Sequence, residues 1–404
     1  MKRFFCIPML VLMCALLLTG CGAKTEPVSA PAVTAAPTPE PTPTPTPEPV
    51  FADILGQRYG EDTTSLNLTL MKEEDVPAVA AELGKLPLLS QIALAADGSY
   101  TALSYDALDA LQAAAPGAQL LCRFELNGLE ADWETTELRY YDVPVGDEGI
   151  DEYRRALPYL PSLALLRFED CGIEDNDAMD ALRADFPDKG VVWNIYIGGY
   201  SFMTDTILMN SPMLRDDNVY LLNYMHDVLY LDVGHNHFLS NIDFVRNFPK
   251  LQAVIVSITN LSDISPLAGC PDLEFFEGFS TNISDLSPLS GLKNLRYVNI
   301  GDNQYLADLT PLYGMELLKV RICGRTRNHV TDEMIAELRA NLPTDCDVAV
   351  VGGHSANSGG WRYTPAGEYN ERYRLLRRQM LYDLPTWEMR QQNSASDLKE
   401  VPDV

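Results

Sequence analysis

The sequence predicts an α/β solenoid, in which a curved parallel sheet forms the concave face and helices and loops cover the convex face. Short apolar triplets recur every 22 residues over part of the chain, and a Pro-containing turn phrase follows most of them. A longer helix, Pro and strand phrase occurs three times around that block. Repeats of roughly 20 to 50 residues are typical of solenoids, because one short strand cannot bury its apolar face alone.

The most regular repeats lie at residues 228–323. Their strands start 22 residues apart at Leu251, Leu273, Leu295 and Leu317, and a further copy starts 23 residues earlier at Val228. Each copy has apolar residues at its first, fourth and usually sixth positions. Stacked copies are therefore expected to form one parallel sheet over a continuous core.

A turn phrase of Asp, an aliphatic residue, Ser or Thr, Pro and Leu follows three of these strands. Its acidic residues are Asp263, Asp285 and Asp308, which we interpret as solvated turn residues, with a row of Ca²⁺ ligands as the alternative. Pro fixes φ and ends the strand, and the aliphatic side chains return to the core. The bends carry Asn260, Asn282 and Asn303, whose amides are expected to bond the backbone of the adjacent coil.

This period and this turn phrase resemble the leucine-rich repeat family, and within it the internalin-like type with 22-residue repeats. Gly278 at a core position and a shifted loop around Asn303 depart from the family pattern. The resemblance implies adhesion or ligand capture, and the variety of functions on this scaffold leaves the ligand open.

Longer repeats flank the regular block, with helices that stop before Pro116, Pro187 and Pro343 and lead into strands. They resemble the α/β type of the same family. We therefore predict a single solenoid from Ser65 to Val351, with about 11 or 12 coils, inside a domain at residues 51–353.

The amino-terminal end predicts export and a lipid anchor. Residues 1–20 combine a basic start with an apolar stretch too short to span a membrane, and Leu18-Thr19-Gly20-Cys21 resembles the cleavage site of bacterial lipoproteins. This resemblance implies lipidation of Cys21 and attachment to the extracytoplasmic face of the cell membrane. Residues 21–50 are rich in Pro and Thr and are expected to act as an extended spacer.

The carboxyl-terminal residues 354–404 contain a predicted amphipathic helix with Tyr369, Tyr373, Leu376 and Met380 on one face. Four arginines lie on its other faces: Arg372, Arg374, Arg377 and Arg378. The favoured interpretation is a cap on the open end of the solenoid, since terminal coils need a cover. Docking on an acidic partner, or on the protein's own acidic flank, is the alternative.

Composition excludes some partners. The net charge of −27 provides no basic footprint for nucleic acid. Cys122, Cys171, Cys270, Cys323 and Cys346 have irregular spacing that indicates neither a disulfide framework nor a metal site. The sequence contains no nucleophile elbow, HExxH motif or phosphate-binding glycine loop, so we predict a protein that is not an enzyme and has no cofactor.

Two patterns favour weaker alternatives. His235 and His237 beside Asp232 suit zinc, which keeps a metal-dependent enzyme or envelope hydrolase open. His354 and Ser355 suggest a nucleophile, although a glycine-rich linker is the better interpretation. A purely structural component of the cell envelope is the third possibility.

Concave strand positions that do not point into the core predict the binding surface. These positions hold Trp193, Tyr196, Tyr230, Asp232, His235, Phe275, Glu277, Phe279, Arg296, Tyr297, Asn299, Lys319 and Arg321. Aromatic, arginine and acidic side chains together are typical of a binding hot spot. We predict a monomer that presents this surface to a protein or glycan ligand.

Overall fold

The computed structural model describes residues 50–211, 213–323, 329–352, 358–382 and 393–397. These residues belong to one compact unit, Pro49–Val404. The predicted leader, Cys21 and nearly all of the spacer lie outside the described residues, as do His354 and Ser355. No helix within the described ranges combines the length and apolar character needed to cross a membrane.

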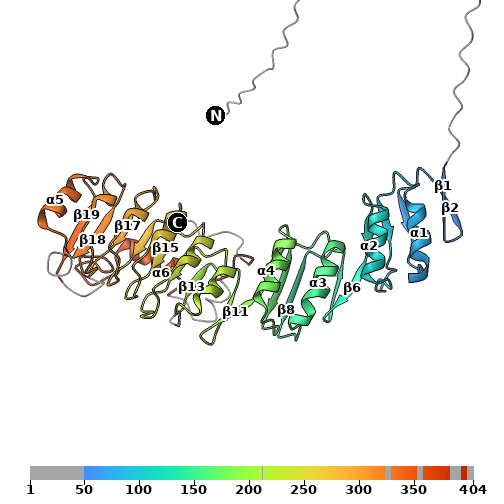
Figure 1. The fold of residues 1–404 in the computed structure, drawn as a ribbon, viewed down its shortest axis with the longest axis horizontal. Helices are drawn as coiled ribbons and strands as arrows, with labels where there is room; N and C mark the ends of the chain where they lie inside the picture. Colours follow the sequence, from blue (N-terminus) through green and yellow to red (C-terminus); the bar gives the residue numbers. More distant parts are fainter. Residues whose placement is uncertain (1–49, 212, 324–328, 353–357, 383–392, 398–404) are drawn as a thin grey trace, which may run out of the picture. The chain divides into compact units, whose positions relative to one another are not determined.

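The chain forms successive modules that each begin with an antiparallel hairpin (Figure 1). The first module contains the first sheet, a parallel sheet in the order β3-β4-β5. Its elements are β1 (Phe51–Ile54), β2 (Gln57–Gly60), β3 (Ser65–Asn67), η1 (Glu73–Asp75), α1 (Val76–Leu83), β4 (Gln91–Ala93), α2 (Tyr105–Ala114) and β5 (Gln119–Leu121).

The second module repeats this plan around the second sheet, a parallel sheet in the order β8-β9-β10. Its elements are β6 (Arg123–Leu126), β7 (Leu129–Asp132), β8 (Glu137–Tyr141), η2 (Asp147–Gly149), α3 (Ile150–Ala156), η3 (Leu157–Tyr159), β9 (Leu165–Glu169), α4 (Asn176–Asp185) and β10 (Gly190–Val192).

The third module contains the main sheet, which has seven parallel strands in chain order from β13 to β19. Its strands are β11 (Asn194–Ile197), β12 (Tyr200–Met203), β13 (Leu208–Asn210), β14 (Tyr230–Asp232), β15 (Ala253–Ile255), β16 (Phe275–Glu277), β17 (Tyr297–Asn299), β18 (Lys319–Cys323) and β19 (Asp347–Val351). Its helices are η4 (Val219–Tyr224), η5 (Asp243–Asn247), η6 (Ser265–Gly269), η7 (Ser287–Leu289), η8 (Thr310–Leu312), α5 (Asp332–Ala340) and α6 (Glu371–Gln379).

The prediction of one uninterrupted solenoid from Ser65 to Val351 is wrong, because two hairpins divide the parallel strands into three sheets. After β5 the chain continues into β6, which pairs with β7 in an antiparallel hairpin rather than joining the first sheet. The same change follows β10, where β11 pairs with β12. Each hairpin therefore ends one parallel ladder before the next begins.

The hairpins recur at a spacing that the sequence analysis missed. They begin at Phe51, Arg123 and Asn194, which are 72 and 71 residues apart. The turn of the second hairpin has φ of 46° at Asn127 and 86° at Gly128. Positive φ at both central residues is the requirement of the type I′ turn, which matches the twist of paired strands. The Asn-Gly pair was the available sequence signal.

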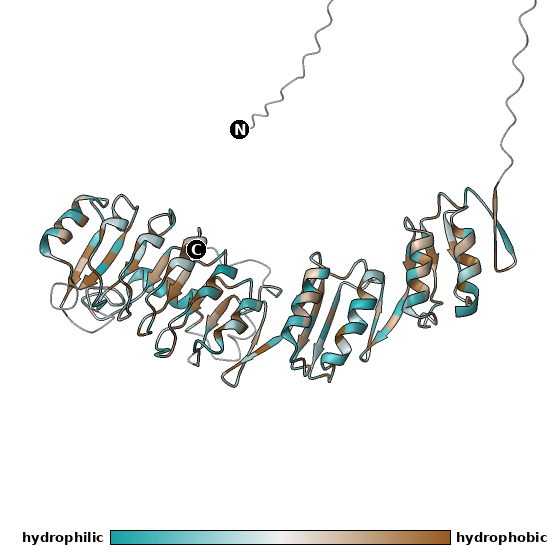
Figure 2. Ribbon diagram, in the orientation of Figure 1, coloured by the Kyte–Doolittle hydropathy of each residue, from teal (hydrophilic) through white to brown (hydrophobic). Residues whose placement is uncertain are grey.

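The predicted core positions of the regular repeats are buried. Leu251, Val254 and Val256 are all 0 % exposed, and the strands of the main sheet are largely hydrophobic in Figure 2. Gly278 departs from this pattern for a steric reason. A Cβ atom there would lie 2.7 Å from the Phe276 ring and 3.0 Å from Ile283, whose side chains fill the space.

The turn residues have structural contacts. Asp263, Asp285 and Asp308 each accept a hydrogen bond from the backbone N–H two residues later, at 2.7 to 2.8 Å. Buried Asn303 donates to the backbone oxygens of Gly278 and Ile300. Asn260 is exposed and Asn282 is half-buried, and each donates to the backbone of the preceding coil. These contacts hold adjacent coils together.

Candidate ligand-binding site

The C-terminal segment, residues 358–382, lies on the concave face of the main sheet. It contributes Trp361, Tyr373, Leu376 and Met380 to an apolar cluster. The sheet contributes Tyr230, Ala253, Ile255 and Phe275, and the residues before its strands contribute Ile207 and Leu229. The expected cap at the end of the solenoid is therefore wrong. The helix docks on the protein itself, as the alternative interpretation proposed, but on an apolar face as well as on acidic groups.

Glu277 fixes the start of this segment. Its side chain is 0 % exposed and accepts hydrogen bonds from Trp361 Nε1 at 2.5 Å and Arg362 Nη2 at 2.8 Å. Ser257 donates its hydroxyl at 3.1 Å to Oε1, the same carboxylate oxygen that accepts from Arg362. A buried carboxylate needs such partners because its desolvation is costly.

Asp232 and Tyr382 form a second contact, in which the tyrosine hydroxyl donates to the carboxylate. Burial raises the pKa of Asp232, and the hydrogen bond from Tyr382 opposes that shift. The same environment raises the pKa of Tyr382. This contact holds the residues that follow α6 against β14.

Arg321 is also enclosed by the segment. It donates from Nε to the backbone oxygen of Ser358 at 2.9 Å and from Nη1 to Asn299 Oδ1 at 3.0 Å. Its guanidinium lies 5.1 Å from the centre of the Phe279 ring. Burial lowers its pKa, an effect that nearby Cys323 and Glu277 oppose.

A terminal stretch, residues 393–397, contacts the second and main sheets. The side chain of Asn393 accepts from Leu208 N at 2.6 Å and donates to Leu208 O at 2.8 Å. Ser394 donates to Asp205 at 2.5 Å, and that carboxylate also accepts from Arg167 at 3.0 Å. The last part of the described chain therefore joins two modules.

These contacts correct the predicted exposed surface. The side chains that the structure buries are Trp193, Tyr230, Phe275, Glu277, Phe279, Asn299 and Arg321. Asp232, Arg296, Tyr297 and Lys319 are half-buried. Phe275, Glu277 and Arg321 are covered because the C-terminal segment occupies the face on which they were expected to meet a ligand.

Three predicted residues lie away from that face. Trp193 packs beneath Arg183 and donates Nε1 to Asn176 at 2.8 Å, so it belongs to the core. Tyr196 is 48 % exposed on the third hairpin, β11 and β12, where its hydroxyl donates to Asp170. His235 is exposed on the loop after β14.

The possible zinc site does not assemble in the part of the chain that the structure describes. No three His, Cys, Asp or Glu side chains come close enough there to hold a metal ion. Asp232 instead accepts hydrogen bonds from Tyr382 and from the backbone N–H of Gly234.

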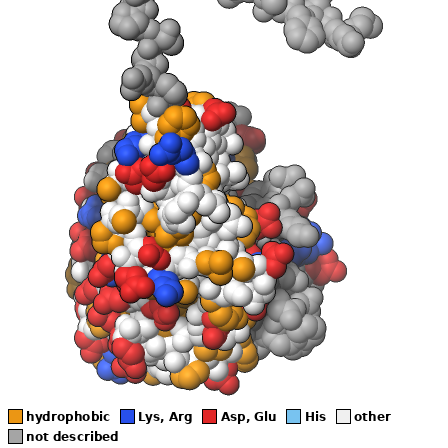
Figure 3. Space-filling model, turned by 90° about the vertical axis from the view of Figure 1, so that its right-hand side faces the viewer, with side chains coloured by type: hydrophobic (Ala, Val, Ile, Leu, Met, Phe, Trp, Pro, Cys, Tyr) orange, Lys and Arg blue, Asp and Glu red, His pale blue; other side chains and the backbone are white. Residues whose placement is uncertain are grey.

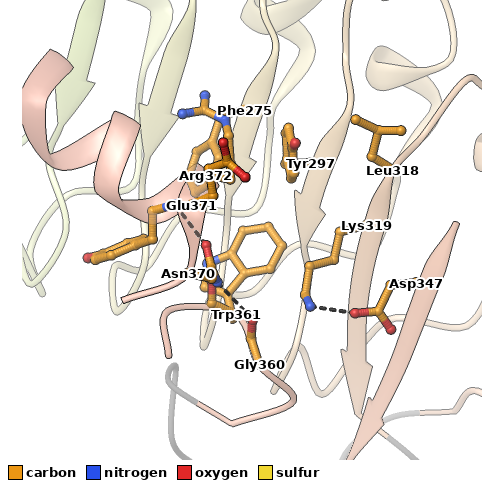
Figure 4. Close-up of a pocket in the computed structure, with 11 residues that line it drawn as sticks. Phe275, Tyr297, Leu318, Lys319, Asp347, Gly360, Trp361, Asn370, Glu371 and Arg372 are labelled. Carbon is orange, nitrogen blue, oxygen red and sulfur yellow. Dashed lines mark hydrogen bonds and ion pairs between the residues drawn. The ribbon is translucent and has the colours of Figure 1, made fainter. Parts of the chain in front are cut away.

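A pocket of about 240 Å³ lies between the main sheet and the C-terminal segment (Figure 4). Its lining residues are Phe275, Tyr297, Leu318, Lys319, Asp347, Gly360, Trp361, Asn370, Glu371, Arg372 and Tyr373. The Phe275 ring centre lies 5.2 Å from that of Trp361 and 6.3 Å from that of Tyr297. Side chains far apart in sequence thus form one aromatic wall.

Charged groups complete the pocket. Lys319 Nζ lies 2.5 Å from a carboxylate oxygen of Asp347. The Arg372 guanidinium lies 5.1 Å from the ring centres of both Phe275 and Tyr297. Burial lowers the pKa of Arg372, although Tyr297 and Glu274 act in the opposite direction. Such a pocket offers ring faces for packing and a cation for a polar group.

Asn370 positions the start of α6 at this pocket. Its side chain accepts from the backbone N–H of Tyr373 at 2.8 Å and caps the helix. It also donates to the backbone oxygens of Gly360 at 2.9 Å and Trp361 at 2.7 Å. One amide therefore joins the loop and the helix that line the pocket, which keeps both in place.

Comparisons with solved structures find leucine-rich repeat proteins. They include an internalin of Listeria monocytogenes, with 14% identity, a TM-score of 0.31 and coverage of 69% of this chain but only 64% of that one. Internalin C2 of the same organism has 18% identity and a TM-score of 0.28 over 68% of this chain and 92% of that one. A leucine-rich repeat protein of Leptospira interrogans has 13% identity and a TM-score of 0.29, covering 66% and 74%.

No model of a known protein family matches the sequence, and no curated protein matches it either. The register of the main sheet itself defines the class. Its central strands pair in parallel at intervals of 22 residues, from Phe275 to Tyr297 and from Tyr297 to Lys319. The fold is thus a leucine-rich repeat solenoid, and the predicted fold class is confirmed.

Proposed function

We propose that this protein is a lipid-anchored, extracytoplasmic binding protein that captures a ligand in the pocket between the main sheet and the C-terminal segment. The pocket is the observation that carries this proposal. It combines ring faces with Lys319, Asp347 and Arg372, and ligand sites are typically concave, mostly apolar and provided with a few placed polar groups. The proposed activity is binding without catalysis.

The proposed location rests on the sequence alone. Leu18 to Cys21 fit a lipoprotein cleavage site, and Pro and Thr in residues 21–50 suit a spacer between the membrane and the folded unit. Attached acyl chains hold a protein on a bilayer because each buried methylene contributes about 0.8 kcal/mol.

The negative net charge limits the classes of partner that the protein is expected to bind. One face of the molecule shows acidic side chains spread widely and basic side chains gathered in a few places (Figure 3). With a net charge of −27, the protein repels nucleic acid over most of its surface. We propose that it binds a protein or glycan ligand locally, and that it does so as a monomer.

A binding assay tests the pocket. The soluble chain, residues 22–404, is applied to arrays of glycans and of bacterial surface proteins, beside a variant with Tyr297→Ala and Lys319→Ala. The variant is expected to lose at least tenfold in affinity for the ligand found, because both side chains line the pocket and are half-buried. Tyr141→Ala is the matched control, because the Tyr141 side chain is 69 % exposed and does not line the pocket. Unchanged binding by the double variant would exclude the pocket.

The anchor has a separate test. In the producing cell, Cys21→Ala is expected to abolish incorporation of a labelled fatty acid and to release the protein from the membrane fraction. Cys122→Ala is the control, since that thiol is buried between β5 and β6. Continued labelling of the Cys21→Ala protein would contradict the proposed anchor.

A further inference from the structure

Arg372 lacks the partner that a half-buried cation normally has. Its guanidinium donates to Gln379 Oε1 at 3.1 Å and lies over two aromatic rings. Within the described ranges, no carboxylate lies within ion-pair distance of it, although the chain has 57 acidic residues. Glu274 influences it electrostatically without forming an ion pair. A cation withdrawn from water in this way favours an anionic ligand.

The other charges of the pocket do not supply that anion. Asp347 is already paired with Lys319. Glu371 precedes Arg372 in α6 and is exposed, so water screens its charge. Neighbouring residues of a helix also point in different directions, which makes an ion pair between them unfavourable.

The dimensions and walls of the pocket restrict the shape of the ligand. A volume of about 240 Å³ accommodates a group of about the size of one sugar ring. Beside the pocket, Leu376 and Met380 are both 0 % exposed and cover part of the concave face. This cover favours a compact ligand over an extended peptide. Half-buried Tyr297 offers a ring face against which the C–H face of a sugar packs, and Trp361, 3 % exposed, closes the pocket beside it.

We propose that the pocket binds an acidic sugar, with the carboxylate of a uronic acid at Arg372 and the sugar ring against Tyr297. Lys319 and Asp347 provide a donor and an acceptor for sugar hydroxyls. This inference rests on the proposed function and names the chemistry of its ligand.

Titrations with defined sugars test it. The soluble chain is titrated with D-glucuronate and D-galacturonate, and with D-glucose and D-galactose as neutral counterparts, and binding is followed by nuclear magnetic resonance. The uronates are expected to bind at least tenfold more tightly than the neutral sugars. Equal affinity would overturn the role of the carboxylate. Tighter binding of N-acetylphenylalanine than of either uronate would overturn the sugar in favour of a peptide carboxylate.

Variants locate the contact. Arg372→Gln is expected to weaken uronate binding by about ten- to a hundredfold, while Arg378→Gln, an equal charge change at an exposed position of α6, leaves it unchanged. Glu371→Gln is expected to strengthen uronate binding about two- to threefold by removing a repelling charge. A melting temperature for Arg372→Gln close to that of the parent establishes that the site remains folded, and Arg372→Lys reports on the loss of the guanidinium fork alone.

The outcomes separate this inference from the proposed function. If the arrays identify a ligand whose binding needs Tyr297 and Lys319 but no uronate binds, the acidic sugar is wrong and the binding pocket stands. If uronates bind equally to the parent and to Arg372→Gln, the site assigned to the carboxylate is wrong. If neither the arrays nor the sugars depend on any pocket residue, both proposals fail.

Discussion

The first sheet and the main sheet differ in the side chains at the strand positions that point away from the core. In the first sheet, Ser65, Asn67 and Gln91 point away from the core and are exposed. In the main sheet, Ala253, Ile255 and Phe275 occupy outward positions, and the C-terminal segment covers them. Both regions use the same inward core. The outward residues therefore decide whether a repeat presents a free concave face or a covered one.

Helices on the other face differ as well. The first module has α1 and α2 between its strands, whereas the central coils of the main sheet have short 3-10 helices that begin with Ser-Pro-Leu or Thr-Pro-Leu. Shorter connections give the regular spacing of 22 residues that the sequence displays. Longer helical connections vary in length, which hides the repeat in the first two modules.

Removal of residues 358–404 gives the largest expected effect on this comparison. It exposes Leu229, Ile255, Phe275 and their neighbours, and burial of each such side chain contributes about 1.5–3 kcal/mol. We expect strong binding of a hydrophobic dye and loss of the main-sheet unfolding transition, with hydrogen exchange in the first module unchanged. A soluble, dye-free protein with an unaltered transition would show that the main sheet does not need its cover.

A milder form of this change is Leu376→Ala. This side chain is 0 % exposed on the buried face of α6, so the substitution is expected to lower the free energy of unfolding by about 2–5 kcal/mol. Leu70→Ala is the control, because Leu70 is 89 % exposed and its truncation is expected to cost less than about 0.5 kcal/mol. Urea unfolding measures both.

The next prediction compares two acidic residues. Glu277→Ala removes the buried partner of Trp361 and leaves half-buried Arg362 without its ion pair, with an expected loss of about 3–5 kcal/mol in unfolding free energy. Glu137→Ala breaks the exposed pair with Arg139 on the second sheet and is expected to cost about 0–1 kcal/mol. Equal losses would show that the segment does not depend on the buried carboxylate.

The sequence predicted the inward half of the fold well. Positions such as Leu251 and Leu273 are buried as expected, because apolar periodicity directly reflects a shared core. It did not predict the cover, yet a signal was present. Ala253, Val254, Ile255 and Val256 form an unbroken apolar run, which is typical of a strand buried on both faces. The prediction treated only alternate positions of each strand as core and therefore placed half of this run on the exposed concave face.

The candidate site was predicted in part. Tyr297 and Lys319 are half-buried in the pocket, as their outward strand positions suggest. Trp361 and Arg372 were missed as lining residues, because their meeting with β16 and β17 depends on tertiary docking across a long stretch of chain. Local pattern carries no information on such a contact.

The hairpins offer a smaller test of the modular division. Gly128→Ala places a side chain at φ of 86°, which is expected to cost about 1–2 kcal/mol. Gly84→Ala is the control, since φ there is −60° and no atom lies within 4 Å of the added Cβ. Hydrogen exchange is expected to rise in the second module alone. A matching rise throughout the main sheet would contradict independent modules.

The smallest expected effect concerns the pH dependence of the covered face. Burial raises the pKa of Asp232 in the folded protein, so between its ordinary value near pH 4 and the raised value the folded state holds a proton that the unfolded state has released. Stability from this group therefore falls as the pH rises through that window.

Asp232→Asn keeps an oxygen acceptor for Tyr382 and cannot ionise. We expect its melting temperature to exceed that of the parent by about 1–3 °C at pH 7 and to match it more closely below pH 4. Asp285→Asn, at an exposed turn, controls for the loss of one charge. A difference for Asp232→Asn that is independent of pH would show that the docked segment does not disfavour the ionised carboxylate.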